Sequence, residues 1–485
     1  GTLPVLTKVF VRKLRSLGWN VGKLYSVNNL GAFVGCFLAG FLLMRWVGLR
    51  HSILIAAALN LASAVIVFVL SKVEKRQTHP EPAEPEVLIS AHQSDILPTW
   101  LIRLVLITFA IEGFTTLAYE VIWTRILLGF SYDKSVYFYT TVILSFIFGL
   151  SVGSFLIAKV TDIRKNLLAL FAGIELAIGI LAILLLSVFA GFADILIEWR
   201  MNYGDSWWAS LGKEYLIFFV AMLLPTTLMG MTFPIVSKIC TPHLKRLGTR
   251  IGEIGFLDTV GSILGAFVAG FILIPFLGVI KAVILTALIN IGIGLLLIVL
   301  HPHLRRRSKL SFVAGMAIIF TVLMIYLPGA EYFQYWQTQR LSDRLLYYNE
   351  GADATIAVPQ HADGTKFLAI NGSVTAFANF GDIRVHKMLG YLPYLLHEEP
   401  EHSLVIGLGM GITAQSLLQP GMQRVDCVEI NRGVVEASLA YFDAENNDAL
   451  LQDRVNVIVD DGRSYLQTKD QTYDIITSNA VHARL

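Results

Sequence analysis

The chain has 485 residues, of which 55% are hydrophobic and only 15% are charged, and its formal net charge is +2. This composition excludes an ordinary soluble protein and indicates that most of the chain lies in a lipid bilayer. We therefore expect the protein to have the bilayer as a partner. The balanced charge, without a basic stripe, argues against a nucleic-acid partner, and the cysteines Cys36, Cys240 and Cys427 lack the spacing of metal ligands, so no metal is expected.

Apolar runs of about 20 residues, each long enough to cross a bilayer as a helix, fill the first two thirds of the chain. The nine runs are 28–47, 51–71, 99–119, 136–159, 166–193, 215–237, 255–277, 280–300 and 311–327. We therefore expect residues 1–328 to form an α-helical multi-pass membrane bundle. Residues 72–98 are polar and contain the Pro-rich HPEPAEPE, which predicts a loop between two halves of the bundle.

An internal repeat relates two parts of this bundle. NNLGAFVGCFLAGFLLMRWVGL from Asn28 aligns with DTVGSILGAFVAGFILIPFLGV from Asp258 at a constant shift of 230 residues. The repeat, over 28–71 and 258–301, predicts parallel six-helix halves, an arrangement that some transporters use. Because the first copy begins at what would be its fifth helix, we expect a fragment truncated at both ends.

Three glutamates fall inside the apolar runs, where an unpaired carboxylate costs a few kcal/mol. They are Glu112, Glu120 and Glu175. Glu120 can pair with Arg125 near the membrane interface. A role of these carboxylates in transport or proton movement is the alternative, and the residues leave both interpretations open.

After Pro328 the sequence changes to short alternating runs of ordinary charge, which predicts a soluble part. We expect a small β-region and a first helix in 329–400, and a Rossmann-like α/β domain of the class I methyltransferase type, incomplete at its C-terminus, in 401–485. In that domain LVIG (404–407), the glycine turn GLGMG (407–411) and RVDCVEI (424–430) form a βαβ unit.

Polar groups follow each predicted strand of this domain. Gly407, Gly409 and Gly411 make a turn with room for a ligand backbone after the first strand. Glu429 ends the second strand, where a carboxylate can accept both hydroxyls of a ribose. Asp461 follows the third strand, at the place of an adenine amino group, and Asn479 ends the fourth. The ends of parallel strands meet at one edge, so these residues predict a nucleoside-binding crevice.

VIGLGMGITAQSLL, VDCVEINRGVVEAS, VIVDDGRSYL and YDIITSNAVH resemble the nucleoside-binding core of spermidine synthases, the polyamine aminopropyltransferases. LLYYNEG at 345, LAINGSV at 368–374 and the helix at 381–396 resemble that family's amino-terminal region. The membrane part, with FTTLAYEVIWTR, resembles multi-pass bacterial proteins in which such a domain is fused to a transporter-like bundle. The resemblance therefore implies a protein of the bacterial inner membrane.

This resemblance implies transfer of an aminopropyl group from decarboxylated S-adenosylmethionine to an amine such as putrescine, with S-adenosylmethionine as the related donor. The glycine turn would hold the methionine-derived part, Glu429 the ribose and Asp461 the adenine, while His386 and Thr375 would line the amine side. Asn479 occupies the position of the family's deprotonating aspartate, and asparagine cannot act as that base.

Three further positions depart from the family. Met410 replaces an aspartate, Thr375 a glutamine and Lys387 a glutamate. Three alternatives to spermidine formation are therefore open: a different acceptor, a methyl-transfer reaction, or a cofactor-binding domain that catalyses no reaction. His482 is an alternative base for deprotonating the amine. A transporter-like membrane protein with a non-catalytic nucleoside-binding or scaffold domain is the alternative function.

Lysine and arginine concentrate in alternate loops, as the positive-inside rule predicts for cytoplasmic loops. These segments are 8–23, 72–76, 159–165, 238–250 and 305–309. If 311–327 also crosses the membrane, the soluble part lies outside the cytoplasm, where sulfonium cofactors are not made. The sequence leaves the side of the soluble part undecided, and the oligomeric state unknown.

Overall fold

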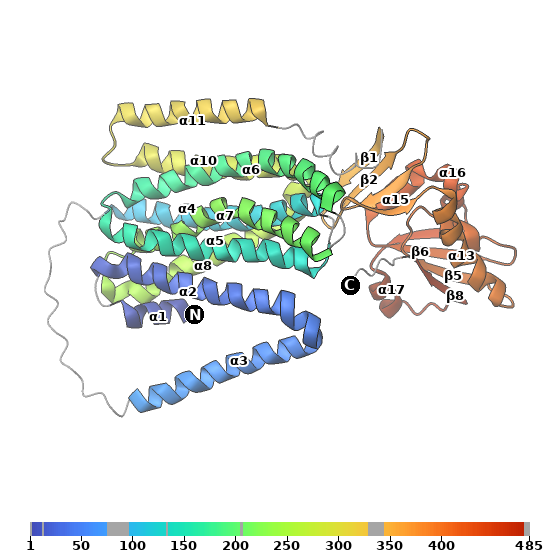
Figure 1. The fold of residues 1–485 in the computed structure, drawn as a ribbon, viewed down its shortest axis with the longest axis horizontal. Coiled ribbons are helices and arrows are strands. Elements are labelled where there is room, and N and C mark those ends of the chain that lie inside the picture. Colours follow the sequence, from blue (N-terminus) through green and yellow to red (C-terminus); the bar gives the residue numbers. More distant parts are fainter. Residues whose placement is uncertain are drawn as a thin grey trace.

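The computed structural model describes residues 2–11, 14–74, 97–131, 134–203, 207–327 and 344–479. Figure 1 shows a bundle of long helices, followed along the chain by a smaller part that contains all the labelled strands. The predicted loop 72–98 falls mostly outside the described residues, although 72–74 belong to a helix. His482 also lies outside them.

Most of the bundle helices run side by side, whereas α3 points away from the others (Figure 1). Their bounds are α1 (Thr2–Phe10), α2 (Leu17–Phe37), α3 (Met44–Glu74), α4 (Thr99–Phe130), α5 (Val136–Ile163), α6 (Leu167–Tyr203), α7 (Trp207–Cys240), α8 (Leu247–Val268), α9 (Ile274–Leu277), α10 (Val279–Leu300) and α11 (Arg306–Tyr326). In the described part of the chain, 8 helices are long and apolar enough to cross a membrane, so this is a multi-pass membrane protein.

The sequence predicted nine such helices, and the difference arises at the first two. Both predicted runs lie within one helical stretch, Leu17–Leu70. This stretch turns at Gly48, whose φ of 75° and ψ of 170° are not helical. Because a positive φ strains any residue with a Cβ atom, glycine permits this corner, which lies within α3.

The two copies of the repeat share the same local irregularities. A 3-10 turn at Leu14–Ser16 has its counterpart at Leu244–Arg246, at the shift of 230 residues. A π-helical turn follows each long helix, at Leu38–Leu43 and Ala269–Leu273. Gly278, the counterpart of Gly48, has a φ of 79° and a ψ of 163°. Since π-helical turns are rare, their recurrence supports a common origin of the two copies.

Small residues bring the bundle helices close together. α5 packs against α7 and α2, α4 packs against α8, and α6 packs against α10. A Cβ atom at Gly153 of α5 would lie 1.8 Å from the carbonyl oxygen of Thr227 in α7, and one at Gly261 of α8 would lie 1.9 Å from that of Ala110 in α4. Neither position can hold a larger residue without separating the helices.

The soluble part has two sheets. The first is an antiparallel meander in the order β1-β2-β3-β4, and the second is parallel in the order β7-β6-β5-β8. The bounds are β1 (Arg344–Glu350), β2 (Thr355–Gln360), β3 (Phe367–Ile370), β4 (Ser373–Phe377), α13 (Phe380–Leu396), β5 (His402–Ile406), α14 (Ile412–Leu417), β6 (Arg424–Glu429), α15 (Arg432–Tyr441), α16 (Asp443–Asn446), β7 (Val455–Val459), α17 (Gly462–Thr468) and β8 (Ile475–Ser478). The strand order reverses beside β5, where open α/β sheets bind ligands.

One hydrophobic core joins the two sheets. Ile356 and Leu368 of the meander pack with Met410, Val434 and Phe442 of the α/β domain, and all five are nearly inaccessible to solvent. The meander is thereby fixed relative to the glycine turn, which contains Met410.

The meander docks on the end of the bundle where α4 ends and α10 begins. Glu350 Oε2 accepts a hydrogen bond from the backbone N–H of Val279 at 2.6 Å, a favourable position for a carboxylate because it is the N-terminus of α10. A Cβ atom at Gly372, in the β3–β4 turn, would lie 2.5 Å from the carbonyl oxygen of Gly129. Lys134 Nζ donates to the carbonyl oxygen of Asn371 in the same turn.

This docking end lies opposite the basic end of the bundle. α5, α7 and α10 finish at Ile163, Cys240 and Leu300, next to the lysine- and arginine-rich segments. α10 begins at the opposite end with Val279, which contacts the meander. α11 forms one more candidate span between the basic end and the soluble part (Figure 1).

Candidate functional site

The glycine turn between β5 and α14 requires its glycines. Gly407, Gly409 and Gly411 have φ angles of 84°, 55° and 79°. Residues with a Cβ atom rarely adopt this left-handed backbone. The N–H of Gly407 donates to the carbonyl oxygen of Val428 at 2.8 Å, which holds the turn beside the end of β6. The predicted turn is thus formed, at the carboxyl edge of the parallel sheet.

Glu429 is tied to this turn by its own carboxylate. Its side chain is buried, with Oε2 accepting from the N–H of Leu408 at 2.9 Å and Oε1 accepting from the N–H of Asn431 at 3.0 Å. Each carboxylate oxygen has a further lone pair for a second donor. Glu429 can therefore remain bound to the backbone and still accept two hydroxyl groups of a ligand.

Asp461 lies at the same edge but is exposed to solvent. It caps α17, because its Oδ1 accepts from the N–H of Ser464 at 2.8 Å. The preceding residue, Asp460, donates its N–H to the carbonyl oxygen of Glu429 at 3.1 Å. The end of β7 is thereby joined to the end of β6, where the sequence placed the adenine and ribose positions side by side.

His386 and Asn479 meet although 93 residues separate them in the sequence. His386 Nδ1, on α13, lies 2.8 Å from Oδ1 of Asn479, which follows β8. An amide oxygen can only accept, so Nδ1 donates and the lone pair of Nε2 is left for another proton. A Cβ atom at Gly409 would lie 2.9 Å from Asn479 Nδ2, so the pair also borders the glycine turn.

The other predicted amine-side positions have different surroundings. Thr375 lies in β4, where its Oγ1 donates to the carbonyl oxygen of Leu368 at 3.0 Å. In the described residues, no hydrogen bond joins Thr375 to His386 or Asn479. Met410 is only 2% exposed and packs in the core shared with the meander. An apolar residue suits that position because its side chain is surrounded by other apolar side chains.

A second buried carboxylate on β6 has a structural role. Asp426 accepts from Tyr473 Oη and Arg424 Nε, both at 2.8 Å, and from Asn456 Nδ2 at 3.2 Å. Its donors are all protein side chains, whereas those of Glu429 are backbone groups of the crevice. Burial also raises the pKa of the neighbouring Cys427 thiol to about 12, so this cysteine is not a nucleophile near neutral pH.

Sequence reasoning missed several residues around Glu429. Asn431 caps α15 and is only 6% exposed. Its Nδ2 donates to Asp353 Oδ2 at 2.8 Å. Ser438 of α15 donates to the carbonyl oxygen of Gly409. An asparagine directly after a strand and before a helix was a signal for the cap, but no spacing pattern linked it to Asp353, 78 residues earlier.

Arg125 also differs from its predicted role. Its guanidinium, near the end of α4, donates to the carbonyl oxygens of Gly351, Ala352 and Asp353 at 2.6 to 2.9 Å, and not to Glu120 as the sequence suggested. The predicted partner, Glu120, is five residues away on the same helix, and this spacing places the two side chains on different faces of the helix. The partners observed belong to the loop between β1 and β2.

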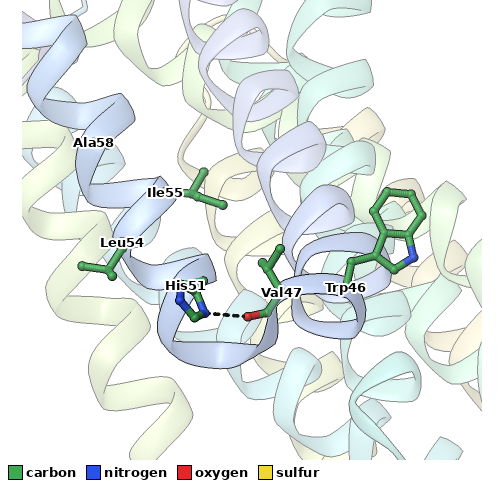
Figure 2. A pocket seen from close by; sticks show the side chains of 6 residues that line it. All are labelled: Trp46, Val47, His51, Leu54, Ile55 and Ala58. Carbon is green, nitrogen blue, oxygen red and sulfur yellow. Dashed lines mark hydrogen bonds between the residues drawn. The ribbon is translucent and has the colours of Figure 1, made fainter.

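A separate hollow lies at the bend of α3 around Gly48. It has a volume of about 610 Å³ and is lined by Trp46, Val47, His51, Leu54, Ile55 and Ala58. Figure 2 shows the hydrogen bond of 2.9 Å between His51 Nδ1 and the carbonyl oxygen of Val47. Its walls are mainly apolar, and none of the predicted site residues lines it.

Two family models match the chain. The Major Facilitator Superfamily model matches residues 2–266, and the model of the Spermine/spermidine synthase domain matches residues 382–483.

Curated relatives are named polyamine aminopropyltransferase. The protein of Oceanobacillus iheyensis is 24% identical over 341 residues, which make up 70% of this chain and 63% of the relative. The protein of Leptospira interrogans is 23% identical over 344 residues, 70% of this chain and 64% of the relative. That of Thermoplasma volcanium is 30% identical over 151 residues, 29% of this chain and 55% of the relative. The chain thus spans less than two thirds of each of these relatives.

Solved structures of spermidine synthases also match. One, in complex with the transition state analogue AdoDATO, has 22% sequence identity and a TM-score of 0.28, with 29% of this chain and 48% of that chain covered. The enzyme of Thermotoga maritima has 22% identity and a TM-score of 0.27, with 29% and 49% covered.

Proposed function

This chain belongs to the Major Facilitator Superfamily and carries a spermine/spermidine synthase domain, and we propose that it is a membrane-anchored aminopropyltransferase. Its donor would be decarboxylated S-adenosylmethionine and its acceptor a primary amine such as putrescine. In this proposal the bundle anchors the enzyme in the bacterial inner membrane. The boundaries proposed for its parts are 1–328, 329–400 and 401–485.

The observation that carries the proposal is the arrangement of polar groups at one edge of the parallel sheet. The glycine turn, Glu429, Asp461 and the pair of His386 and Asn479 follow β5, β6, β7 and β8 or border them. We assign the ribose hydroxyls of the donor to Glu429, its adenine to Asp461 and its methionine-derived part to the glycine turn. The amine would enter beside His386.

In this reaction the amine nitrogen attacks the aminopropyl carbon next to the sulfonium sulfur. The carbon–sulfur bond breaks, methylthioadenosine leaves, and the attacking nitrogen gives up one proton. Asn479 cannot take that proton, so we assign it to Nε2 of His386. Asn479 would then be a positioning residue that fixes the imidazole with Nδ1 protonated, as its hydrogen bond at 2.8 Å supports.

The test uses the full chain in lipid nanodiscs, with decarboxylated S-adenosylmethionine and putrescine, and measures released methylthioadenosine. Loss of a general base lowers rates by about 10²- to 10⁴-fold, so His386→Ala should reduce turnover by that factor. His397→Ala is the matched control, because this exposed histidine lies at the other end of α13. A parallel reaction with S-adenosylmethionine tests methyl transfer.

Donor binding without release of methylthioadenosine in the presence of any amine tested would exclude the catalytic proposal and leave a binding domain. Equal rates of His386→Ala and the wild type would exclude His386 as the base. In that case a faster rate of Asn479→Asp than of the wild type would indicate a different mechanism, because a carboxylate at this position can take the proton directly.

A second candidate function is the transport of an amine cation, and a buried polar network in the bundle favours it. Glu175 of α6 is fully buried and accepts from Asn290 Nδ2 of α10 at 2.8 Å. Asn290 Oδ1 accepts in turn from Tyr119 Oη of α4 at 3.0 Å. Carboxylates at membrane depth commonly mark substrate or proton paths. Uptake of labelled putrescine into proteoliposomes that is lost in Glu175→Gln would support transport, and no uptake by the wild type would exclude it.

A further inference from the structure

The loop between β1 and β2 is held by one residue of the membrane bundle. The loop turns within four residues, with the N–H of Gly351 donating to the carbonyl oxygen of Ala354 at 2.8 Å. The carbonyl oxygens of Gly351, Ala352 and Asp353 then converge on the guanidinium of Arg125. A planar guanidinium can serve several acceptors at once, whereas a lysine ammonium is a single point charge.

The same guanidinium reaches the second turn of the meander. Arg125 Nη1 lies 3.3 Å from Oδ1 of Asn371, which also accepts from the N–H of Thr355 at 2.9 Å. Arg125 therefore binds both meander turns that face the bundle. Its helix is a fixed support, because Tyr119, Ile122, Trp123 and Ile126 of α4 are fully buried.

From the loop, the contacts continue to the crevice. Asp353, whose carbonyl oxygen binds Arg125, accepts from Asn431 Nδ2 through its own carboxylate. The backbone N–H of Asn431 donates to Oε1 of Glu429, and Asn431 Oδ1 caps α15. Three residues thus connect α4 with the carboxylate assigned to the donor ribose: Arg125, Asp353 and Asn431.

We infer that Arg125 is a positioning residue of the nucleoside site, so that the bundle and the soluble part form a single binding unit. Arg125 fixes Asp353, Asp353 orients Asn431, and Asn431 holds Glu429 toward the ribose. A short surface loop without such a support samples many conformations. The inference rests on the proposed function, because it gives Glu429 the role of binding the donor.

The test measures donor affinity and steady-state kinetics on the full chain in lipid nanodiscs. Arg125→Gln should weaken binding of decarboxylated S-adenosylmethionine about three- to tenfold, which lies in the lower part of the range for coupling within one hydrogen-bond network, and Arg125→Lys should fall between it and the wild type. KM for the donor should rise while KM for the amine stays unchanged. Lys134→Gln is the matched control, because Lys134 is a cation at the same interface that donates to the carbonyl oxygen of Asn371.

A double-mutant cycle separates positioning from simple docking. Asp353→Ala removes the carboxylate that binds Asn431 but keeps the carbonyl oxygen that binds Arg125. If both residues act on Glu429 by one path, the double variant loses no more donor affinity than the single variant that has the larger loss. Additive losses, or an Arg125→Gln variant that binds the donor as tightly as the wild type, would overturn the inference. Absence of donor binding by the wild type would instead refute the proposed function.

Discussion

Replacement of Glu429 by glutamine tests the centre of the proposed nucleoside site. In the wild type both carboxylate oxygens accept backbone N–H groups, from Leu408 at 2.9 Å and from Asn431 at 3.0 Å. A glutamine keeps one acceptor oxygen, but its NH₂ group then faces an N–H that needs an acceptor. The variant therefore loses one charged hydrogen bond and leaves one buried donor unsatisfied.

Hydrogen bonds to charged groups contribute about 1.5 to 3 kcal/mol each, so Glu429→Gln should lower the free energy of unfolding of the soluble part by about 2 kcal/mol. Donor binding should weaken further, because a ribose hydroxyl that donates to the carboxylate also loses its partner. A loss of 2 to 3 kcal/mol corresponds to about a 30- to 150-fold weaker affinity for decarboxylated S-adenosylmethionine.

The assay is calorimetric titration of the full chain in nanodiscs, together with thermal unfolding. Asp426→Asn is the matched control, since Asp426 is also buried on β6 but binds only side chains away from the glycine turn. We expect the control to lose stability and to retain donor affinity at temperatures where it is folded. A folded Glu429→Gln variant with wild-type donor affinity would refute the assignment of Glu429 to the ribose.

Three further predictions concern the turn, the pH dependence and the orientation. Gly409→Ala should cost about 1 to 2 kcal/mol in stability, because alanine is strained at a φ of 55° and its Cβ atom would meet Asn479 Nδ2. Gly421→Ala is the control, since Gly421 also has a positive φ but has open space around its Cβ position. Equal donor affinity of the two variants would contradict the role of the turn. The backbone N–H groups of His402 and Glu401 lower the pKa of Asp474, so its contribution to stability is present above its unfolded pKa of about 4 and is lost as the pH falls through the lower folded value. The melting temperatures of wild type and Asp474→Asn should therefore differ most at neutral pH and converge as the pH falls through the lowered pKa of Asp474, and a difference independent of pH would contradict this. Because the soluble part docks opposite the basic segments, the charge pattern predicts that a protease added to intact spheroplasts cleaves it. The proposed use of a donor made in the cytoplasm predicts cleavage only after lysis, so this experiment decides between the two.

The sequence predicted the soluble part well because its signals are local. The strand at 404–407, the glycine turn and Glu429 follow one another within one βαβ unit, and the structure has them at those positions within two residues. The nearness of His386 and Asn479 was implied only by the family resemblance, since 93 residues separate them.

The docking contacts were outside the reach of sequence reasoning. Arg125 and the loop it binds are more than 220 residues apart, and neither has a spacing pattern that indicates the other. The nearest carboxylate in sequence, Glu120, was therefore the natural but wrong partner. The bend at Gly48 falls in the gap that the sequence left between the apolar runs 28–47 and 51–71, although both runs belong to one helical stretch.

The duplicated glycine corner is used differently in the two copies. At Gly278 the corner is filled, since a Cβ atom there would lie 2.8 Å from Oε2 of Glu350, whereas no atom of the described residues lies within 4 Å of one at Gly48. The hollow of Figure 2, with Trp46 and His51 in its walls, is thus the vacant counterpart of the docking corner. The described docking contacts come from α4, the α4–α5 connection and α10, all C-terminal to the first copy of the repeat. The soluble part is therefore fixed to one half of a pseudo-symmetric bundle, the half that contains α4 and α10. Any rocking motion between the two halves moves the soluble part with that half alone.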